Sequence, residues 1–273
     1  MPGPNWNWGP SAAMARDGSR LYAGTPEGLA VYTDPINTIG DEPDFYLSPG
    51  GPGSGSQDCT ACALDETNDR VYAIYQTFSP NKTWVWGWTN ASAITADRQA
   101  DFGCQVPNVL ANSIAVGGND IVFLADAFDI FVFDGVHLDA GTEHAPDRRM
   151  TYVGHGEFQP MAYDEWRDLL YMFHAQEHWE HTIKVIENAS TADGQDPACH
   201  EFGGSGSLIG GSNDRVVDIT VFPDDDLLFV TNHGKSYILV FADASTLTGQ
   251  VAPTNSVYVS DEIENAAIWR ESE

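Results

Sequence analysis

DITVFPDDDLLFVTNHGKSYILVF, residues 218–241, contains three apolar runs separated by two polar turns. The runs occupy residues 218–222, 227–230 and 237–241, and the turns between them are rich in Asp, Asn and Gly, which favour turns. A further apolar run follows at residues 257–259. Runs joined in this way are predicted to form one antiparallel four-stranded sheet of about 45 residues, the size of one propeller blade.

The same unit recurs along the chain. Its second run carries an Asp-x-apolar-aromatic signature, with Ser19 in place of Asp in the first copy. The aromatic residue falls at positions 22, 72, 123, 171 and 229, so the steps are 50, 51, 48 and 58 residues. Steps of this size suit one sheet per repeat. We expect the Asp carboxylate to bond backbone N–H groups in the tight turn before the strand.

A single sheet of this kind cannot bury both of its faces, so the sequence predicts an all-β fold, a propeller of four-stranded antiparallel blades in one domain. The five units are residues 12–47, 59–104, 113–153, 161–202 and 218–259, and the two termini are expected to close the ring. A sixth, composite blade built from the termini is the alternative. We expect the first strands to line the axis with residues such as Met14, Cys62, Ala115, Met161 and Ile219.

The charge of the chain is strongly acidic. Forty Asp and Glu residues against 12 Lys and Arg residues give a net charge of −28. Such a field repels phosphate backbones and anionic membranes, which argues against nucleic acid as a partner. The charge is interpreted as a solvated surface, with cation binding or docking to a basic partner as the alternative.

Two features of the sequence concern its location. No 18-residue apolar run is present, so no transmembrane segment is expected, and the start of the chain lacks a signal-peptide pattern. Either the protein is cytoplasmic or its signal was removed. We expect an exported protein, which is secreted, periplasmic or at the cell surface.

Four cysteines are present, at positions 59, 62, 104 and 199. An even number in a β protein of secreted type suggests disulfides, and four cysteines allow three connectivities. Cys59 precedes the second unit and Cys104 ends it, so this pair is a candidate disulfide that would lock the blade. Cys59 and Cys62 also form a C-x-x-C pattern, but no histidine follows for haem attachment and no second pair exists for zinc.

The strongest candidate for chemistry is the segment HAQEHWEH, residues 174–181. Its candidate ligands His174, Glu177, His178 and His181 could bind Zn²⁺ or Cu²⁺ through imidazole and carboxylate groups. The alternative is an ordinary exposed hairpin, because the segment joins two predicted strands. The acidic turns at residues 65–69 and 224–226 could bind Ca²⁺ weakly, although turn formation explains them better.

Three tryptophans alternate in residues 84–88 and therefore share one face of a strand. They are interpreted as core between blades, with an exposed aromatic platform for a sugar or a partner as the alternative.

The turn after the third run also repeats, as NAS at residues 90–92, NASTADG at 188–194 and DASTLTG at 243–249. Together with the motifs DRVY (residues 69–72) and SYILVF (236–241), it resembles the bacterial NHL/YVTN-type β-propeller repeat proteins. The resemblance covers nearly the whole chain. It implies a propeller, often secreted, that acts as an interaction or scaffold module, and it marks no catalytic residues.

The working hypothesis is a non-catalytic exported scaffold that binds another protein or a glycan. Such a scaffold could also be a subunit of a larger assembly. The first alternative is a metal-dependent hydrolase or lyase with its site in the central channel. The second is a metal-binding accessory protein that uses the loop of residues 174–181. Carboxylates or histidines from several blades that converge on the axis would favour the enzyme.

Overall fold

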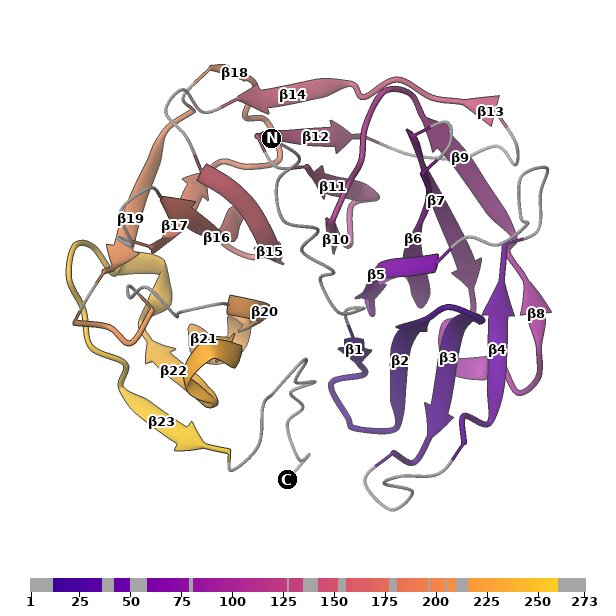
Figure 1. Ribbon diagram of the computed structural model, residues 1–273, viewed down its shortest axis with the longest axis horizontal. Helices are drawn as coiled ribbons and strands as arrows, with labels where there is room; N and C mark the ends of the chain where they lie inside the picture. Colours follow the sequence, from indigo (N-terminus) through magenta and orange to yellow (C-terminus); the bar gives the residue numbers. More distant parts are fainter. Residues whose placement is uncertain are drawn as a thin grey trace.

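The computed structural model describes residues 12–35, 42–49, 58–78, 81–126, 128–134, 142–151, 156–176, 181–195, 197–204, 206–209 and 216–259. These residues form five β-sheets arranged in a ring around a central axis (Figure 1). The prediction of an all-β propeller with five blades is confirmed. The termini, residues 1–11 and 260–273, lie outside the described residues, so their role in closing the ring stays a prediction.

Each blade is an antiparallel sheet of four main strands, which follow one another outward from the axis. Blade 1 contains β1 (Ala12–Met14), β2 (Arg20–Thr25), β3 (Gly28–Thr33) and β4 (Phe45–Ser48). Blade 2 contains β5 (Asp58–Asp65), β6 (Arg70–Phe78), β7 (Asn81–Thr89) and β9 (Phe102–Val106). Blade 3 contains β10 (Ser113–Gly117), β11 (Ile121–Ala125), β12 (Asp129–Phe133) and β14 (Arg148–Thr151). Blade 4 contains β15 (Gly156–Asp164), β16 (Leu169–Gln176), β17 (Thr182–Glu187) and β19 (Cys199–Gly203). Blade 5 contains β20 (Val216–Phe222), β21 (Leu227–Asn232), β22 (Tyr237–Ala242) and β23 (Asn255–Tyr258).

Helix occurs among the described residues only as three-residue 3-10 turns: η1 (Ala91–Ala93), η3 (Pro223–Asp225), η4 (His233–Lys235) and η5 (Ala244–Thr246). In the described part of the chain, no helix is long and apolar enough to span a membrane.

Short segments tie the outer strands of blades 1 to 4 to the following blade. Three two-residue strands pair in parallel with the outermost strand of the preceding blade: β8 (Arg98–Gln99) with β4, β13 (Thr142–Glu143) with β9, and β18 (Gly194–Gln195) with β14. A parallel bridge between Gly249 and Phe202 makes the same connection from blade 5 to blade 4. These pairings cover strand edges that would otherwise expose unpaired backbone groups.

Apolar cores fill the spaces between successive blades from blade 1 to blade 5. In the first four units the repeated aromatic residue points into the core shared with the next blade and is fully buried: Tyr22, Tyr72, Phe123 and Tyr171. Burial of one such side chain stabilises the fold by about 1.5–3 kcal/mol. The fifth copy, Phe229, is half-buried and packs edge-on against Phe222.

The three alternating tryptophans of β7 lie in the core between blades 1 and 2. Trp84, Trp86 and Trp88 are 7%, 1% and 0% exposed, and the rings of Trp84 and Trp86 stack with centroids 5.5 Å apart. The interpretation as core is confirmed, and the exposed aromatic platform is wrong. Gly103 on the adjacent strand makes room for this packing, because a Cβ there would lie 2.1 Å from the Trp86 ring.

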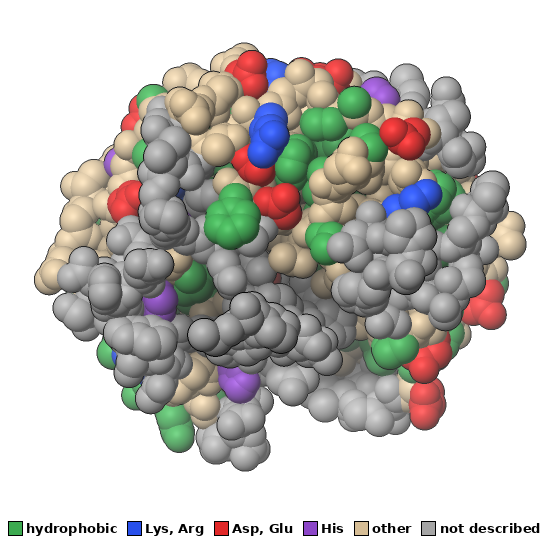
Figure 2. Space-filling view, turned by 45° about the horizontal axis from the view of Figure 1, so that its top comes forward, with side chains coloured by type: hydrophobic (Ala, Val, Ile, Leu, Met, Phe, Trp, Pro, Cys, Tyr) green, Lys and Arg blue, Asp and Glu red, His purple; other side chains and the backbone are tan. Residues whose placement is uncertain are grey.

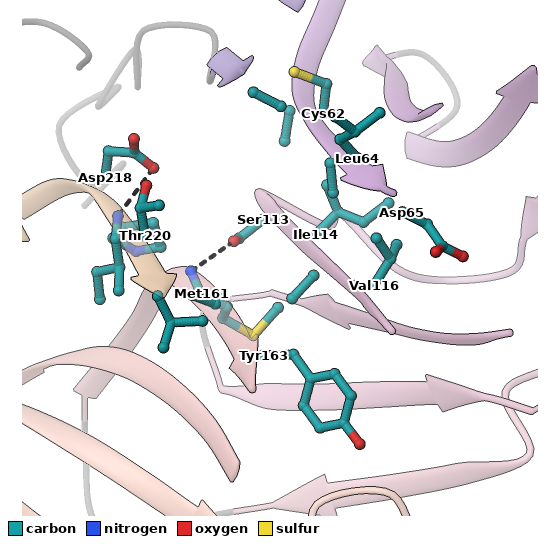
Figure 3. A pocket seen from close by; sticks show the side chains of 18 of the residues that line it. Cys62, Leu64, Asp65, Ser113, Ile114, Val116, Met161, Tyr163, Asp218 and Thr220 are labelled. Atoms are coloured by element: carbon teal, nitrogen blue, oxygen red, sulfur yellow. Dashed lines mark hydrogen bonds between the residues drawn. The ribbon is translucent and has the colours of Figure 1, made fainter. Parts of the chain in front are cut away.

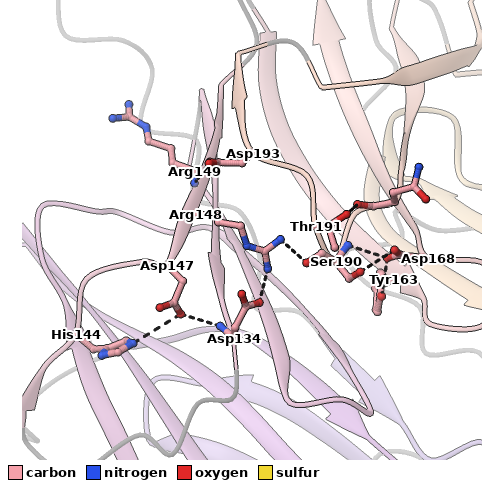
Figure 4. Close-up of polar contacts among 11 residues, drawn as sticks. Asp134, His144, Asp147, Arg148, Arg149, Tyr163, Asp168, Ser190, Thr191 and Asp193 are labelled. Carbon is pink, nitrogen blue, oxygen red and sulfur yellow. Dashed lines mark hydrogen bonds and ion pairs between the residues drawn. The ribbon is translucent and has the colours of Figure 1, made fainter.

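In blades 2, 4 and 5 the repeated Asp has a different role from the one that we expected, whereas Asp120 of blade 3 pairs with Arg70 of blade 2. Asp69, Asp168 and Asp226 adopt the left-handed conformation, with φ between 51° and 55°, which Asp tolerates better than most residues. Within the described residues, no hydrogen bond joins their carboxylates to the preceding turn. Each accepts the backbone N–H and the hydroxyl of the Ser in the repeated Asn/Asp-Ala-Ser turn, at 2.6–3.0 Å: Ser92, Ser190 and Ser245. Asp168 also accepts the Tyr163 hydroxyl at 2.9 Å. The two repeated motifs are therefore the two halves of one clamp within a blade, drawn for Asp168 and Ser190 in Figure 4.

Arginines connect neighbouring blades at their outer parts. Arg148 of blade 3 donates to the carbonyl oxygen of Ser190 in blade 4 and to the carboxylate of Asp134 in its own blade (Figure 4). Arg20, at the start of β2 in blade 1, likewise donates to a carbonyl oxygen of the next blade, that of Ile94 in blade 2, at 2.6 Å. The Asp-Ser clamp thus holds the turn that receives the arginine of the preceding blade.

The predicted disulfide between Cys59 and Cys104 is not formed, and both thiols are free and buried. Cys59 lies on the innermost strand β5 and Cys104 on the outermost strand β9 of the same sheet. Three strand spacings of about 4.8 Å separate them, well beyond the ~7 Å limit between Cα atoms of a disulfide. The two side chains also point into different cores on opposite faces of blade 2.

Candidate binding site in the axial channel

The innermost strands of the five blades, β1, β5, β10, β15 and β20, enclose a channel along the axis with a volume of about 480 Å³. All of the residues that the sequence predicted to line the axis do so: Met14, Cys62, Ala115, Met161 and Ile219. The wall of the channel combines small apolar side chains with polar groups, among them the hydroxyl groups of Ser113 and Thr220 (Figure 3). Thr60 also lines it.

Asp218 is the deeply buried carboxylate of this wall that the sequence reading missed. It is 8% exposed and lies on β20, in the channel lining (Figure 3). One of its oxygens accepts the backbone N–H of Ile219 at 2.9 Å, and among the described residues no other hydrogen bond to this carboxylate is present. Burial raises the pKa of Asp218 to about 7, against a smaller lowering by the Ile219 N–H.

A β-bulge turns Asp218 into the channel. The pairing of β20 with β21 shifts between Val216 and Asp218, so Val217 is an extra residue. Val216 and Ile219, three positions apart, consequently both face the core between blades 4 and 5. Without the extra residue, strict alternation would place residue 218 on the same face as Val216, inside that core. Similar shifts occur near the starts of β5 and β15, so bulges shape three of the five innermost strands.

One mouth of the channel is formed by the turns that follow the innermost strands. We call this the turn face and define it by residues 16–19, 66–69, 118–120, 165–168 and 223–226. Hydrogen bonds join the turns of successive blades all around the ring: the Arg16 N–H to Glu66, Asn68 to the Gly118 carbonyl, the Gly118 N–H to Glu165, and Arg167 to the Pro223 carbonyl. The ring is completed by Arg16, which pairs with Asp224 of blade 5 at 3.2 Å and lies over the Phe222 ring.

The turn face combines acidic side chains with one exposed aromatic. Asp17, Glu66, Glu165, Asp224 and Asp225 are exposed there. Trp166 is 65% exposed and lines the mouth. Figure 2 shows how acidic side chains lie beside apolar ones on the surface that it presents. Because hydrogen bonds between backbone and side-chain groups hold the neighbouring turns together, they also fix the position of Trp166 on the turn face.

Asp65, at the inner edge of this mouth, is 4% exposed, and burial raises its pKa. Its carboxylate accepts hydrogen bonds from the backbone N–H and the side-chain amide of Asn68 at 3.0 and 2.9 Å. Asp65 therefore holds the turn of blade 2, and its oxygens already have donors.

The histidine-rich segment is described only in part, because Glu177 and His178 lie outside the described residues. His174 and His181 are both 6% exposed, and His181 packs edge-on against Phe173. His174 lies 3.8 Å from Glu201, which also pairs with Lys184 at 3.0 Å. Burial, and then the charge of Lys184, lower the pKa of His174 to about 4. The metal site at these four residues stays a prediction.

The channel can also be compared with the requirements of the enzyme alternative. Within the described ranges, no histidine lines it, and no group of three or more His, Cys, Asp or Glu side chains is placed to hold a metal ion. The carboxylates at its mouth, such as Glu66 and Glu165, accept hydrogen bonds from the turns that they fix. Among the described residues, the second carboxylate oxygen of Asp218 accepts no hydrogen bond and can therefore bind a ligand.

No protein-family model and no curated protein matches this sequence. Solved structures match in fold. A chain in the crystal structure of the mitotic checkpoint complex is 11% identical, with a TM-score of 0.57, over 95% of this chain and 68% of that chain. A chain of a humanized mutant of the Chaetomium thermophilum Polycomb Repressive Complex 2 is 13% identical, with a TM-score of 0.51, over 86% of this chain and 55% of that chain. This chain thus spans about half the length of the second neighbour, and at these identities the likeness shows the fold alone.

Proposed function

We propose that this protein is a non-catalytic interaction scaffold that binds a segment of another protein on its turn face. The observation that carries the proposal is Trp166, an aromatic side chain that is 65% exposed on a rim fixed by hydrogen bonds. Tryptophans in such positions are strongly enriched among the residues that dominate binding energy. A rim that is already rigid loses little entropy when a partner binds.

The chemistry of the rim indicates the kind of partner. Five exposed acidic residues lie on the turn face, and the net charge of the chain is −28. Complementary charges speed association and fix the orientation of the partner. The partner segment is therefore basic and has an apolar or aromatic residue that packs on Trp166. The solved structures of similar fold come from protein complexes, which supports a protein partner.

Two finer parts of the proposal concern family and location. The NHL/YVTN resemblance of the repeat motifs supports an exported scaffold, and a glycan is the alternative occupant of the turn face. Fractionation of the source cells tests export: the protein is expected outside the cytoplasm, and a purely cytoplasmic location would remove this part of the proposal.

Selection of random peptides on the immobilised protein tests the binding surface. We expect enrichment of basic peptides with an aromatic residue, and a loss of affinity of about tenfold or more in Trp166→Ala. Tyr258→Ala is a matched control, because Tyr258 is 64% exposed and lies on β23, away from the turn face. If no basic peptides are enriched, or if Trp166→Ala binds them as the parent does, the proposal is wrong. Enrichment of sugars but not peptides on a glycan array would favour the alternative occupant.

A further inference from the structure

Asp218 presents an uncompensated negative charge to a cavity. The side chain is 92% buried, since 8% is exposed, and it lines the axial channel. Its hydrogen bond to the neighbouring N–H of Ile219 engages one oxygen, and the described residues offer no other donor to the carboxylate. A buried carboxylate without a paired charge is unfavourable by several kcal/mol, on the order of the effective penalty for one ion.

The surroundings of Asp218 supply further acceptors for a donor-rich ligand. Thr231 lies directly opposite Asp218 in the pairing of β20 with β21, so the two side chains share one face of the sheet. Thr220 is two residues further along β20 and lines the same channel. One carboxylate and two hydroxyl groups on one face match the three N–H donors of a primary ammonium group.

The wall also contains apolar side chains that suit an alkyl body. Met14, Ala61, Ala115 and Met161 come from four different innermost strands and all face the channel. The volume of about 480 Å³ lies within the range of roughly 300–1,000 Å³ that is common for small-molecule sites. A single carboxylate also fits a single positive charge, whereas Ca²⁺ requires about six to eight oxygen ligands.

We propose that the axial channel binds a small primary alkylammonium ion, whose charged nitrogen pairs with Asp218 and bonds Thr231 and Thr220 while its apolar part packs on the channel wall. This site is separate from the turn face, because Asp218 lies toward the start of β20 and the turn face follows the end of that strand. The protein could therefore fail to bind peptides on the turn face and still bind an amine.

The test uses n-butylammonium as the probe and n-butanol as its neutral counterpart, in isothermal titration calorimetry. Measurements at about pH 8 keep the amine charged and Asp218 ionised, and about 150 mM NaCl screens the surface charges. We expect saturable one-to-one binding of butylammonium that is at least about tenfold tighter than any binding of butanol. Absence of saturable binding would overturn the proposal and leave Asp218 as a buried acid that is merely protonated.

Two variants distinguish the channel from the acidic surface. Asp218→Asn should weaken butylammonium binding about tenfold or more, whereas Glu27→Gln, which removes one exposed charge in the β2–β3 turn, should change it less than about twofold. Thr231→Val keeps the carboxylate and removes a hydroxyl group, and it should weaken binding about threefold or more. If Asp218→Asn and Thr231→Val bind the amine as tightly as Glu27→Gln, the site is elsewhere and the proposal is wrong. Should Asp218→Asn not fold, Thr220→Val decides, because Thr220 lines the channel: binding as tight as in Glu27→Gln would overturn the proposal.

Discussion

The replacement of Asp218 by Asn should make the fold more stable, by an amount that grows with pH. Burial raises the pKa of Asp218 to about 7 in the folded protein, while an unfolded chain has a pKa near the reference value of 3.8. Between these values the folded state binds more protons than the unfolded state, so stability falls as the pH rises from about 4 to about 7. Above that window the loss is constant. Asn has nearly the same shape as protonated Asp and cannot ionise, so the variant escapes this loss.

The magnitude follows from the size of the shift. A difference of about three pKa units corresponds to about 4 kcal/mol, at about 1.4 kcal/mol for each unit. About two of these units lie between pH 5 and pH 7, so the advantage of Asp218→Asn should grow by about 3 kcal/mol from about pH 5 to about pH 8. The causes of the shift are burial and the Ile219 N–H. Among the described side chains, the ionisable groups on the elements packed against β20 are Tyr163 and Asp164 of β15, Tyr171 and His174 of β16, and His233 and Lys235 of η4.

Urea unfolding at a series of pH values measures this effect. Both proteins lose and gain other protons on unfolding, and the difference between the two free energies of unfolding cancels those shared contributions. Glu27→Gln is the control, and its difference from the parent should stay within about 0.5 kcal/mol across the series. A constant difference between Asp218→Asn and the parent from about pH 5 to about pH 8 would refute the assignment of a buried, unpaired carboxylate.

Further substitutions test other parts of the structure by urea unfolding. Ser245→Ala removes the hydroxyl that donates to the Asp226 carboxylate and keeps the backbone N–H bond of the clamp, so it should lower the free energy of unfolding by about 1.5–3 kcal/mol, and a smaller change would indicate that the hydroxyl is incidental. Trp88→Ala should cost about 3–5 kcal/mol because Trp88 is 0% exposed, whereas the 65% exposed Trp166→Ala should cost no more than about 0.5 kcal/mol; equal costs would contradict their placement. Gly103→Ala should cost about 1–3 kcal/mol, since its Cβ would meet an indole at 2.1 Å, and a neutral result would contradict the packing between blades 1 and 2.

The architecture could be predicted because the repeat is visible in short stretches of the sequence. Alternation of apolar residues fixes strands, and a near-constant step places Tyr22, Tyr72, Phe123 and Tyr171 at equivalent points of successive blades. Aligning the five units also predicted which residues line the axis, and Met14, Cys62, Ala115, Met161 and Ile219 all line the channel. These inferences need only the period of a strand and the order of strands in a blade.

The features that were missed depend on contacts that no local pattern encodes. The role of Asp168 becomes visible only when Ser190, 22 residues later, is brought beside it. The orientation of Asp218 depends on one extra residue in β20. The sequence around Val217 contains no pattern that predicts this bulge. The Cys59–Cys104 prediction is wrong because the two ends of a unit lie on the innermost and outermost strands of its blade and are therefore far apart in space.

A crystal structure of the protein grown with n-butylammonium tests the central claim most directly, namely that five blades enclose a channel in which the carboxylate of Asp218 lacks a partner. The account predicts five four-stranded sheets and density for an ammonium group against Asp218, within about 3 Å of its free oxygen. A sixth sheet in the ring, or an Asp218 carboxylate already paired with a basic side chain of the same molecule, would contradict it.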